Sequence, residues 1–283
     1  MKTYLECIPC FMQQALKAGK ISAKDDKQIK HIFDEVGKII PSFSMEYTPA
    51  EYGAEVYKII SEITGVKDPY KQIKDDSIKD AKKLIPYLKY VISKSDNRLL
   101  TAVRIAIAGN IIDFGVNETF SLKDDIEKIL VQDFAISDFN YFKSAVKSAK
   151  TILYIGDNAG ETVFDKLLIE ELGNKKIIYV VREIPIINDA IYEDAVNSGL
   201  SEVSEIISSG VKAPGTILTQ CNKEFLNLFK SSDLVISKGQ GNYEGLSDVK
   251  RPLFFLLKAK CEVIAKDLNV KKNDIIIKGI NLA

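Results

Sequence analysis

The sequence predicts an α/β fold preceded by a helical region. Residues 151–283 alternate short β-rich runs with segments of helical periodicity, whereas residues 1–150 show helical periodicity and almost no strand signal. Strands that alternate with helices form βαβ units, which build a largely parallel sheet covered on both faces. We therefore expect an all-α N-terminal region over residues 1–150 and an α/β domain over residues 151–283.

The helical region is predicted from the spacing of its apolar residues. Between residues 78 and 92, and again between 139 and 149, apolar side chains recur every three or four positions. Thr48 and Pro49 indicate a helix start, because threonine is a good N-cap and proline suits the first helical position. Pro86 falls inside the first pattern, so we expect it to kink or split that helix.

Four β-rich runs define the predicted sheet. They are TILYIG at 151–156, KIIYVV at 176–181, DLVIS at 233–237 and PLFFLLK at 252–258. Helical periodicity occupies the intervals, as in GETVFDKLLIEELG and NKEFLNLFKSS. Ligands of parallel α/β sheets collect beyond the carboxyl ends of the strands, so the residues that follow each run are the candidates for a site.

Length and composition exclude several classes of protein. The 283 residues are 46% hydrophobic and 28% charged, which suits a globular protein and excludes general disorder. Lysine plus arginine and aspartate plus glutamate both number 39, and this neutrality argues against nucleic acid or a membrane as partner. There is no apolar run of ~20 residues and no signal peptide, so we expect a cytoplasmic protein. The oligomeric state is not predicted.

The single histidine limits the chemistry. His31 lies among apolar residues with helical spacing and is interpreted as an ordinary helix residue. A histidine-rich zinc site is therefore excluded. We expect catalysis to use carboxylates, amides, lysines or a metal ion.

Three oxygen-bearing side chains follow two consecutive strands of the predicted sheet. Asp157 and Asn158 follow the first strand in GDNAGE, and Asp189 lies just beyond the second strand. Neighbouring parallel strands lie ~4.8 Å apart, so groups at their ends can meet around one ion. An all-oxygen set suits a hard cation such as Mg²⁺ or Mn²⁺. Two independent helix caps are the alternative, because Asp and Asn favour caps and turns.

A glycine-rich segment, SKGQGNYEGL at 237–246, follows the DLVIS run. Lys238 at the strand end and the nearby Gly239 and Gly241 are typical of an anion-binding loop, because open backbone N–H groups and a positive charge suit a phosphate. The spacing matches neither the Walker loop nor GxGxxG. A flexible surface loop is the alternative.

Asn110 and Asp113 lie three positions apart in RIAIAGNIID, on one face of a predicted helix. A polar pair in an apolar stretch needs partners. These two side chains are either satisfied within the structure or face the open end of the sheet and contact a ligand.

Cys7 and Cys10 form a CxxC motif at the start of a predicted helix, where thiol pKa values fall. A thioredoxin-type motif would follow a central strand, which is missing here. Reduced structural thiols, an accessory metal site and a redox role all remain open.

These motifs together resemble the damage-control phosphatase family, also known as domain of unknown function 89. The resemblance rests on GDNAGE after a strand, IPIINDA one unit later and VISKGQGNYEGL after another strand. CIPC and RIAIAGNIIDFG are similar to the branch of the family that carries a CxxC, and the resemblance runs from Cys7 to about Leu268. It implies an α/β/α sandwich behind a helical N-terminal region.

The resemblance also implies a phosphatase that depends on a divalent metal and hydrolyses phosphomonoesters of small metabolites. The metal would be Mn²⁺, Co²⁺, Ni²⁺ or Mg²⁺, held by Asp157, Asn158 and Asp189. Catalysis would involve Asp157, Glu161 and Lys238, with either a water molecule or the Asp157 carboxylate as nucleophile. Substrate would contact a further set of positions, namely Asn110, Asp113, Lys238, Gly239, Gly241 and Asn242.

Two other functions remain as alternatives. LYIGDNAGE shares features with the first loop of S-adenosylmethionine-dependent methyltransferases, although Asp157 occupies a position that those loops give to a small residue. A non-enzymatic nucleotide- or metal-binding sensor, with the CxxC as a redox switch, is the second alternative.

Overall fold

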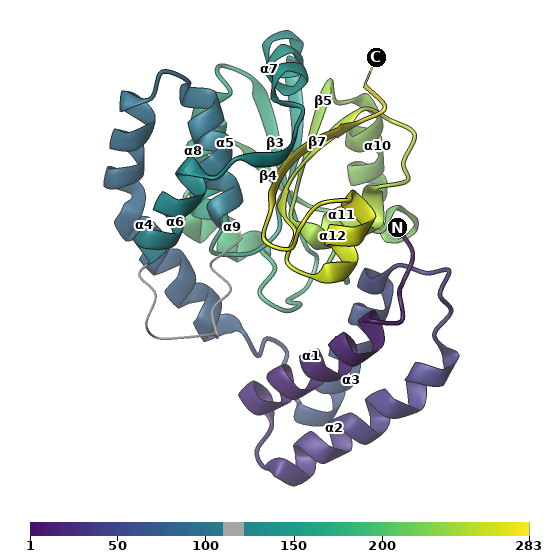
Figure 1. Cartoon of the computed structure of the whole chain (residues 1–283). Helices are drawn as coiled ribbons and strands as arrows, with labels where there is room; N and C mark the ends of the chain where they lie inside the picture. Colours follow the sequence, from purple (N-terminus) through teal and green to yellow (C-terminus); the bar gives the residue numbers. More distant parts are fainter. Residues whose placement is uncertain (110–121, 283) are drawn as a thin grey trace.

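The computed structural model describes residues 1–109 and 122–282 (Figure 1). Within them lies a seven-stranded sheet of order β1-β7-β6-β5-β2-β3-β4. Every pair of neighbours is parallel except β6 and β7, which are antiparallel. The predicted α/β class with a mainly parallel sheet is therefore confirmed. The strands are β1 (Phe134–Ser137), β2 (Thr151–Ile155), β3 (Lys176–Val181), β4 (Glu205–Ser208), β5 (Leu234–Lys238), β6 (Leu253–Lys258) and β7 (Ile275–Ile280).

Alternating side chains of the central strands enter two separate hydrophobic cores. On β2, Ile152 and Tyr154 belong to one core, and Leu153 and Ile155 belong to the other. The first core contains residues of α4 (Lys71–Lys94), α5 (Arg98–Ala108), α6 (Leu122–Val131), α7 (Phe139–Ser148), α8 (Thr162–Glu171) and α9 (Tyr192–Ser198). The second core contains residues of α1 (Cys7–Ser22), α2 (Asp26–Ile39), α3 (Pro49–Thr64), α10 (Lys223–Ser231), α11 (Gln240–Leu246) and α12 (Glu262–Leu268). The sheet is the middle layer of a sandwich.

The first 150 residues are not entirely helical, contrary to the prediction. Strand β1 lies within them and pairs in parallel with β7 at one edge of the sheet. Its four residues are too few to show a clear pattern, and they are only half-buried on alternate positions. Helices α4 to α6 share the first core with the sheet, whereas α1, α2 and α3 pack on one another (Figure 1). The boundary at residue 150 stays a prediction.

The structure confirms the predicted helix start at Thr48, but it shows no break at Pro86. Thr48 caps α3 in a capping box with Glu51, as its sequence indicates. Helix α4 continues through Pro86 and is not split, since Ala81 and Leu88 on either side of the proline are fully buried and hold the helix against its neighbours. His31 is an ordinary helix residue on α2, with an exposed side chain. In the described parts of the chain, no helix has the length and apolar character needed to cross a membrane.

Candidate active site

The turns that follow β2 and β3 are joined by backbone hydrogen bonds. The Asp157 carbonyl accepts from the Ala190 N–H at 2.8 Å, and the Asn188 carbonyl accepts from the Ala159 N–H at 2.8 Å. An isolated β-bridge between Asn158 and Asp189 lies at the same place. The three side chains expected to converge beyond the two strands therefore do lie together at the carboxyl end of the sheet.

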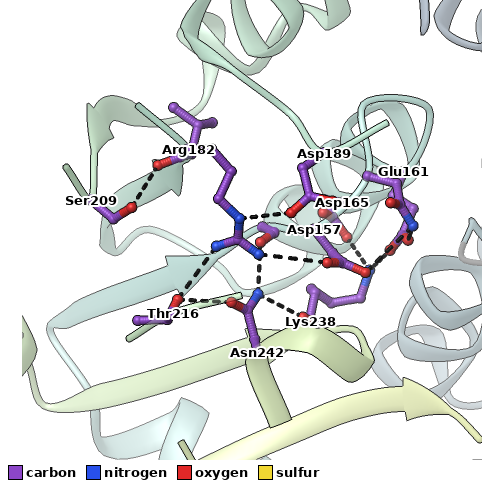
Figure 2. A network of polar contacts seen from close by, with 12 residues as sticks. Asp157, Glu161, Asp165, Arg182, Asp189, Ser209, Thr216, Lys238 and Asn242 are labelled. Atoms are coloured by element: carbon purple, nitrogen blue, oxygen red, sulfur yellow. Dashed lines mark hydrogen bonds and ion pairs between the residues drawn. The ribbon is translucent and has the colours of Figure 1, made fainter. Parts of the chain in front are cut away.

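Arg182 connects the two aspartates of this group (Figure 2). Its Nε donates to Asp189 Oδ2 at 2.7 Å, and its Nη2 lies 3.7 Å from Asp157 Oδ1. On the other side, Nη1 donates to Thr216 Oγ1 at 3.4 Å. The arginine is 2% exposed. Sequence reasoning missed it, although a charged residue directly after an apolar strand was the available signal.

Asn158 links these aspartates to a second group of charges. Its Nδ2 donates to Glu161 Oε1 at 2.7 Å and to Asp157 Oδ2 at 3.4 Å. The amide nitrogen is therefore directed at carboxylates, which leaves the amide oxygen as the atom suited to a cation. Glu161 orients this amide.

Lys238 is fully buried and lies behind Glu161 rather than at an open surface. Its ammonium donates to Glu161 Oε2, Asp165 Oδ1 and the Ala106 carbonyl, each at 2.8 Å. Burial alone would lower the pKa of Lys238, but the charges of Asp165 and Glu161 raise it above its ordinary value. The lysine is charged and all three of its N–H groups are used. In this arrangement no donor remains for the substrate phosphate that the sequence had suggested as its partner.

Asp165 completes this second group and was not predicted, because it lies inside the apolar helix α8. Tyr154 Oη donates to Asp165 Oδ1 and Tyr179 Oη donates to Oδ2, both at 2.7 Å. Burial first, and the Asp165 charge second, raise the pKa of both tyrosines, so they remain donors. Each oxygen of Asp165 therefore has a fixed partner.

The buried charges around Asp157 do not balance. Burial, together with the charge of Asp189, raises the pKa of Asp157 to about 6. Burial raises the pKa of Glu161 to about 7, against the lowering effect of Lys238. Among the described residues, the connected and buried network holds more carboxylates than cations: Asp157, Glu161, Asp165, Asp189, Arg182 and Lys238. Lys260, half-buried beside them, lowers the pKa of three of these carboxylates.

A divalent cation fits this set. Two carboxylates and one amide oxygen are the donors that hard cations prefer, and the ion's charge would offset the excess of carboxylates. The described residues contain no group of three or more His, Cys, Asp or Glu side chains arranged to hold a metal. The set at the two turns has only two acidic members, Asp157 and Asp189, and Asn158 supplies the third donor.

The glycine-rich segment is mostly helical rather than a loop, and its binding of an anion stays a prediction. Gly239 has a φ of +77°, and helix α11 begins at the next residue. A Cβ at Gly239 would overlap the Asp157 carboxylate, and one at Gly241 would overlap the Pro214 carbonyl. These glycines therefore permit close packing around Asp157.

Asn242, on the same helix, braces the ends of two strands. Its Nδ2 donates to the Gly156 carbonyl at 2.9 Å and the Lys238 carbonyl at 2.8 Å. Its Oδ1 accepts from Thr216 Oγ1 at 2.7 Å. The side chain is fully buried, and both amide N–H groups are used within the protein. Its proposed contact with substrate stays a prediction.

Two further sets of candidates remain. Asn110 and Asp113 fall outside the described residues. Cys7 is buried and Cys10 is exposed in the first turn of α1, and both are free thiols. Burial raises the pKa of Cys7 to about 11 and also raises the pKa of Cys10, so neither is an activated thiolate. The role of the CxxC stays a prediction.

Comparison with known proteins identifies relatives over almost the whole chain. Residues 3–276 match the model of the damage-control phosphatase ARMT1-like domain. A damage-control phosphatase from Pyrococcus horikoshii is 34% identical, over 98% of this chain and 97% of its own length. A damage-control phosphatase from Archaeoglobus fulgidus is 32% identical, over 99% of this chain and 100% of its own length.

The fold agrees with this match. The crystal structure of a DUF89 family protein from Pyrococcus horikoshii superposes with a TM-score of 0.89 at 34% identity, and the match covers 98% of both chains. The resemblance drawn from GDNAGE, IPIINDA and VISKGQGNYEGL is therefore confirmed. These findings support a phosphatase role, and they lend no support to a methyltransferase. The chain belongs to the ARMT1-like (DUF89) family of damage-control phosphatases.

Proposed function

We propose that this protein is a phosphatase that requires a divalent metal ion and hydrolyses small phosphorylated metabolites. The observation that carries the proposal is the convergence of Asp157, Asn158 and Asp189 in a network that, among the described residues, is buried and rich in carboxylates. These three residues would hold the ion, with Mn²⁺, Co²⁺, Ni²⁺ and Mg²⁺ as candidates. When bound, such an ion supplies Lewis-acid stabilisation of a phosphoryl oxygen.

The surrounding residues have distinct tasks in this proposal. Glu161 fixes the Asn158 amide, and Lys238 in turn fixes Glu161 through a 2.8 Å contact. Glu161 and Lys238 are therefore positioning residues. Asp157 is 8% exposed and lies at the edge of the network, so its carboxylate either receives the phosphoryl group or orients the attacking water. The catalytic role that the sequence suggested for Glu161 is less favoured, since both of its oxygens already accept hydrogen bonds.

The direct test is a panel of phosphorylated sugars and cofactors assayed with each of the four ions and with chelator. We expect hydrolysis that chelator abolishes and that the ion restores. Asp157→Asn should reduce turnover by about 10³-fold or more, since it removes a charge at the reacting centre. Glu183→Gln is the matched control, because Glu183 lies in the same turn as Arg182 but its side chain is exposed.

A second readout separates metal binding from chemistry. An ion at 100 times its Kd should stabilise the wild-type fold by about 2.7 kcal/mol, and this gain should be absent from Asp157→Asn. Chelator-insensitive hydrolysis, or metal-dependent hydrolysis by Asp157→Asn at the wild-type rate, would contradict the proposal. An inactive wild-type protein across the whole panel would favour the sensor alternative.

A further inference from the structure

The guanidinium of Arg182 contains a donor for which the described residues supply no hydrogen-bond acceptor. The side chain is 2% exposed, and among the described residues Nη2 has no hydrogen-bond partner. The nearest charge recorded for this nitrogen is Asp157 Oδ1 at 3.7 Å, beyond hydrogen-bond distance. Buried donors are nearly always satisfied, so an orphan of this kind calls for an explanation, such as a bound water, a ligand or a catalytic role.

The remainder of the guanidinium is held in a fixed orientation. Asp189 accepts from Nε at 2.7 Å, and Thr216 accepts from Nη1 at 3.4 Å. Thr216 is itself held by Asn242, which is anchored on the Gly156 carbonyl (Figure 2). Thr216, in the turn-rich segment 213–216, and Asn242, in the glycine-rich segment, therefore both help to fix the position of Arg182. Its unpaired nitrogen is consequently directed toward Asp157 rather than free to rotate away.

The other buried cation of the network cannot take the same role. Lys238 has three protein acceptors at 2.8 Å and is fully buried. A contact between Lys238 and a phosphate would break one of these hydrogen bonds. Arg182, in contrast, can add an acceptor at Nη2 without losing any existing partner, and a planar guanidinium matches the oxygens of a phosphoryl group.

We propose that Arg182 binds the phosphoryl group of the substrate through Nη2, while Asp189 and Thr216 hold its other nitrogens. This inference rests on the proposed phosphatase function, and it assigns to Arg182 the contact that the sequence suggested for Lys238. The ligand class is a tetrahedral oxyanion beside the ion held by Asp157, Asn158 and Asp189. Inorganic phosphate, the product of the reaction, is therefore a suitable probe.

Phosphate binding to the Mg²⁺-loaded protein, measured by calorimetry, tests the proposal without turnover. Arg182→Lys keeps the positive charge but loses the planar set of guanidinium donors. We expect the Kd of this variant for phosphate to rise by about tenfold or more. Its affinity for Mn²⁺, measured by electron paramagnetic resonance, should stay within about threefold of wild type. Arg98→Lys is the matched control, because Arg98 is an exposed arginine on α5.

Chemical rescue gives a readout that a purely structural arginine would not produce. Arg182→Ala should lose phosphate binding, and added guanidinium ion should restore it, whereas added ammonium should not. Wild-type phosphate Kd values in both Arg182 variants would overturn the proposal. A wild-type protein that binds phosphate but hydrolyses no phosphomonoester would refute the proposed function alone, and the same variants would still decide the phosphate contact.

Discussion

Two buried charge groups lie side by side in this molecule and differ in how completely they are satisfied. Around Lys238, all three ammonium N–H groups and both oxygens of Asp165 have partners, and the side chains are fully buried. Around Arg182, one guanidinium nitrogen finds no hydrogen-bond partner in the described part of the chain, and Asp157 keeps some exposure. The first group has the completeness of a structural network. The second is acid-rich and incomplete, as expected of groups that await a ligand.

Lys238→Met should disrupt the fully hydrogen-bonded group around Lys238 and produce the largest loss of stability. It leaves Glu161 and Asp165 without their shared cation, which for a buried pair costs about 3–5 kcal/mol. Urea denaturation measures this loss, with Lys230→Met on the exposed end of α10 as the control. The double variant Lys238→Met with Asp165→Asn should be less destabilised than the single one. A loss below about 1 kcal/mol would mean that the group is not structural.

Asp157→Asn should make the metal-free protein more stable near neutral pH, because it removes one buried negative charge from the acid-rich group around Arg182. Folding raises the pKa of Asp157 from 3.8 to about 6, so the folded state retains a proton that the unfolded state has lost. This contribution to stability is complete below about pH 4 and is lost as pH rises through about 6. The variant keeps a neutral side chain throughout. In the absence of metal, its stability relative to wild type should therefore increase between pH 4 and pH 7, by about 3 kcal/mol.

Urea denaturation at a series of pH values, with chelator present, measures this difference. The control Glu183→Gln should follow the wild-type curve with a constant offset. If the difference in unfolding free energy between Asp157→Asn and wild type does not change with pH, burial does not disfavour the ionised form of Asp157.

Tyr179→Phe and Tyr154→Phe should have the smallest effects. Each removes one hydrogen bond to the charged Asp165, which costs about 2 kcal/mol. Tyr179→Phe should cost more, since Lys238 still donates to the oxygen that Tyr154 contacts. Neither variant should change the Kd for Mn²⁺ by more than about twofold. A large change in that Kd would show that the two groups are one functional unit.

The sequence predicted secondary structure well where an element contains a continuous run of apolar residues. The predicted runs match β2, β3, β5 and β6 closely, because buried parallel strands consist of continuous apolar residues. Three strands were missed: β1 and β4 have four residues each and form the edges of the sheet, and β7 follows a lysine-rich turn. Short edge strands bury little surface, so their composition carries little signal.

From the sequence, one could predict which turns come together at the candidate site, but not how their side chains pair. The residues after β2 and β3 could be identified as neighbours because parallel strands end at the same edge of a sheet. The burial of Lys238 could not be inferred, since its partner Asp165 lies 73 residues away inside an apolar helix. A lysine at the end of a strand has the same local sequence whether it faces solvent or a buried carboxylate. Arg182 is different, because its partner Asp189 lies only seven residues away and a charged residue directly after an apolar strand was a usable signal.

The hydrogen bonds that join the turns after β2 and β3 run between main-chain atoms. The main chain thus helps to set the spacing of the two turns, in addition to the contacts that Arg182 makes with both aspartates. Under the proposed function, a substitution at Asn158 or Asp189 would change a donor to the ion while these main-chain hydrogen bonds stay available.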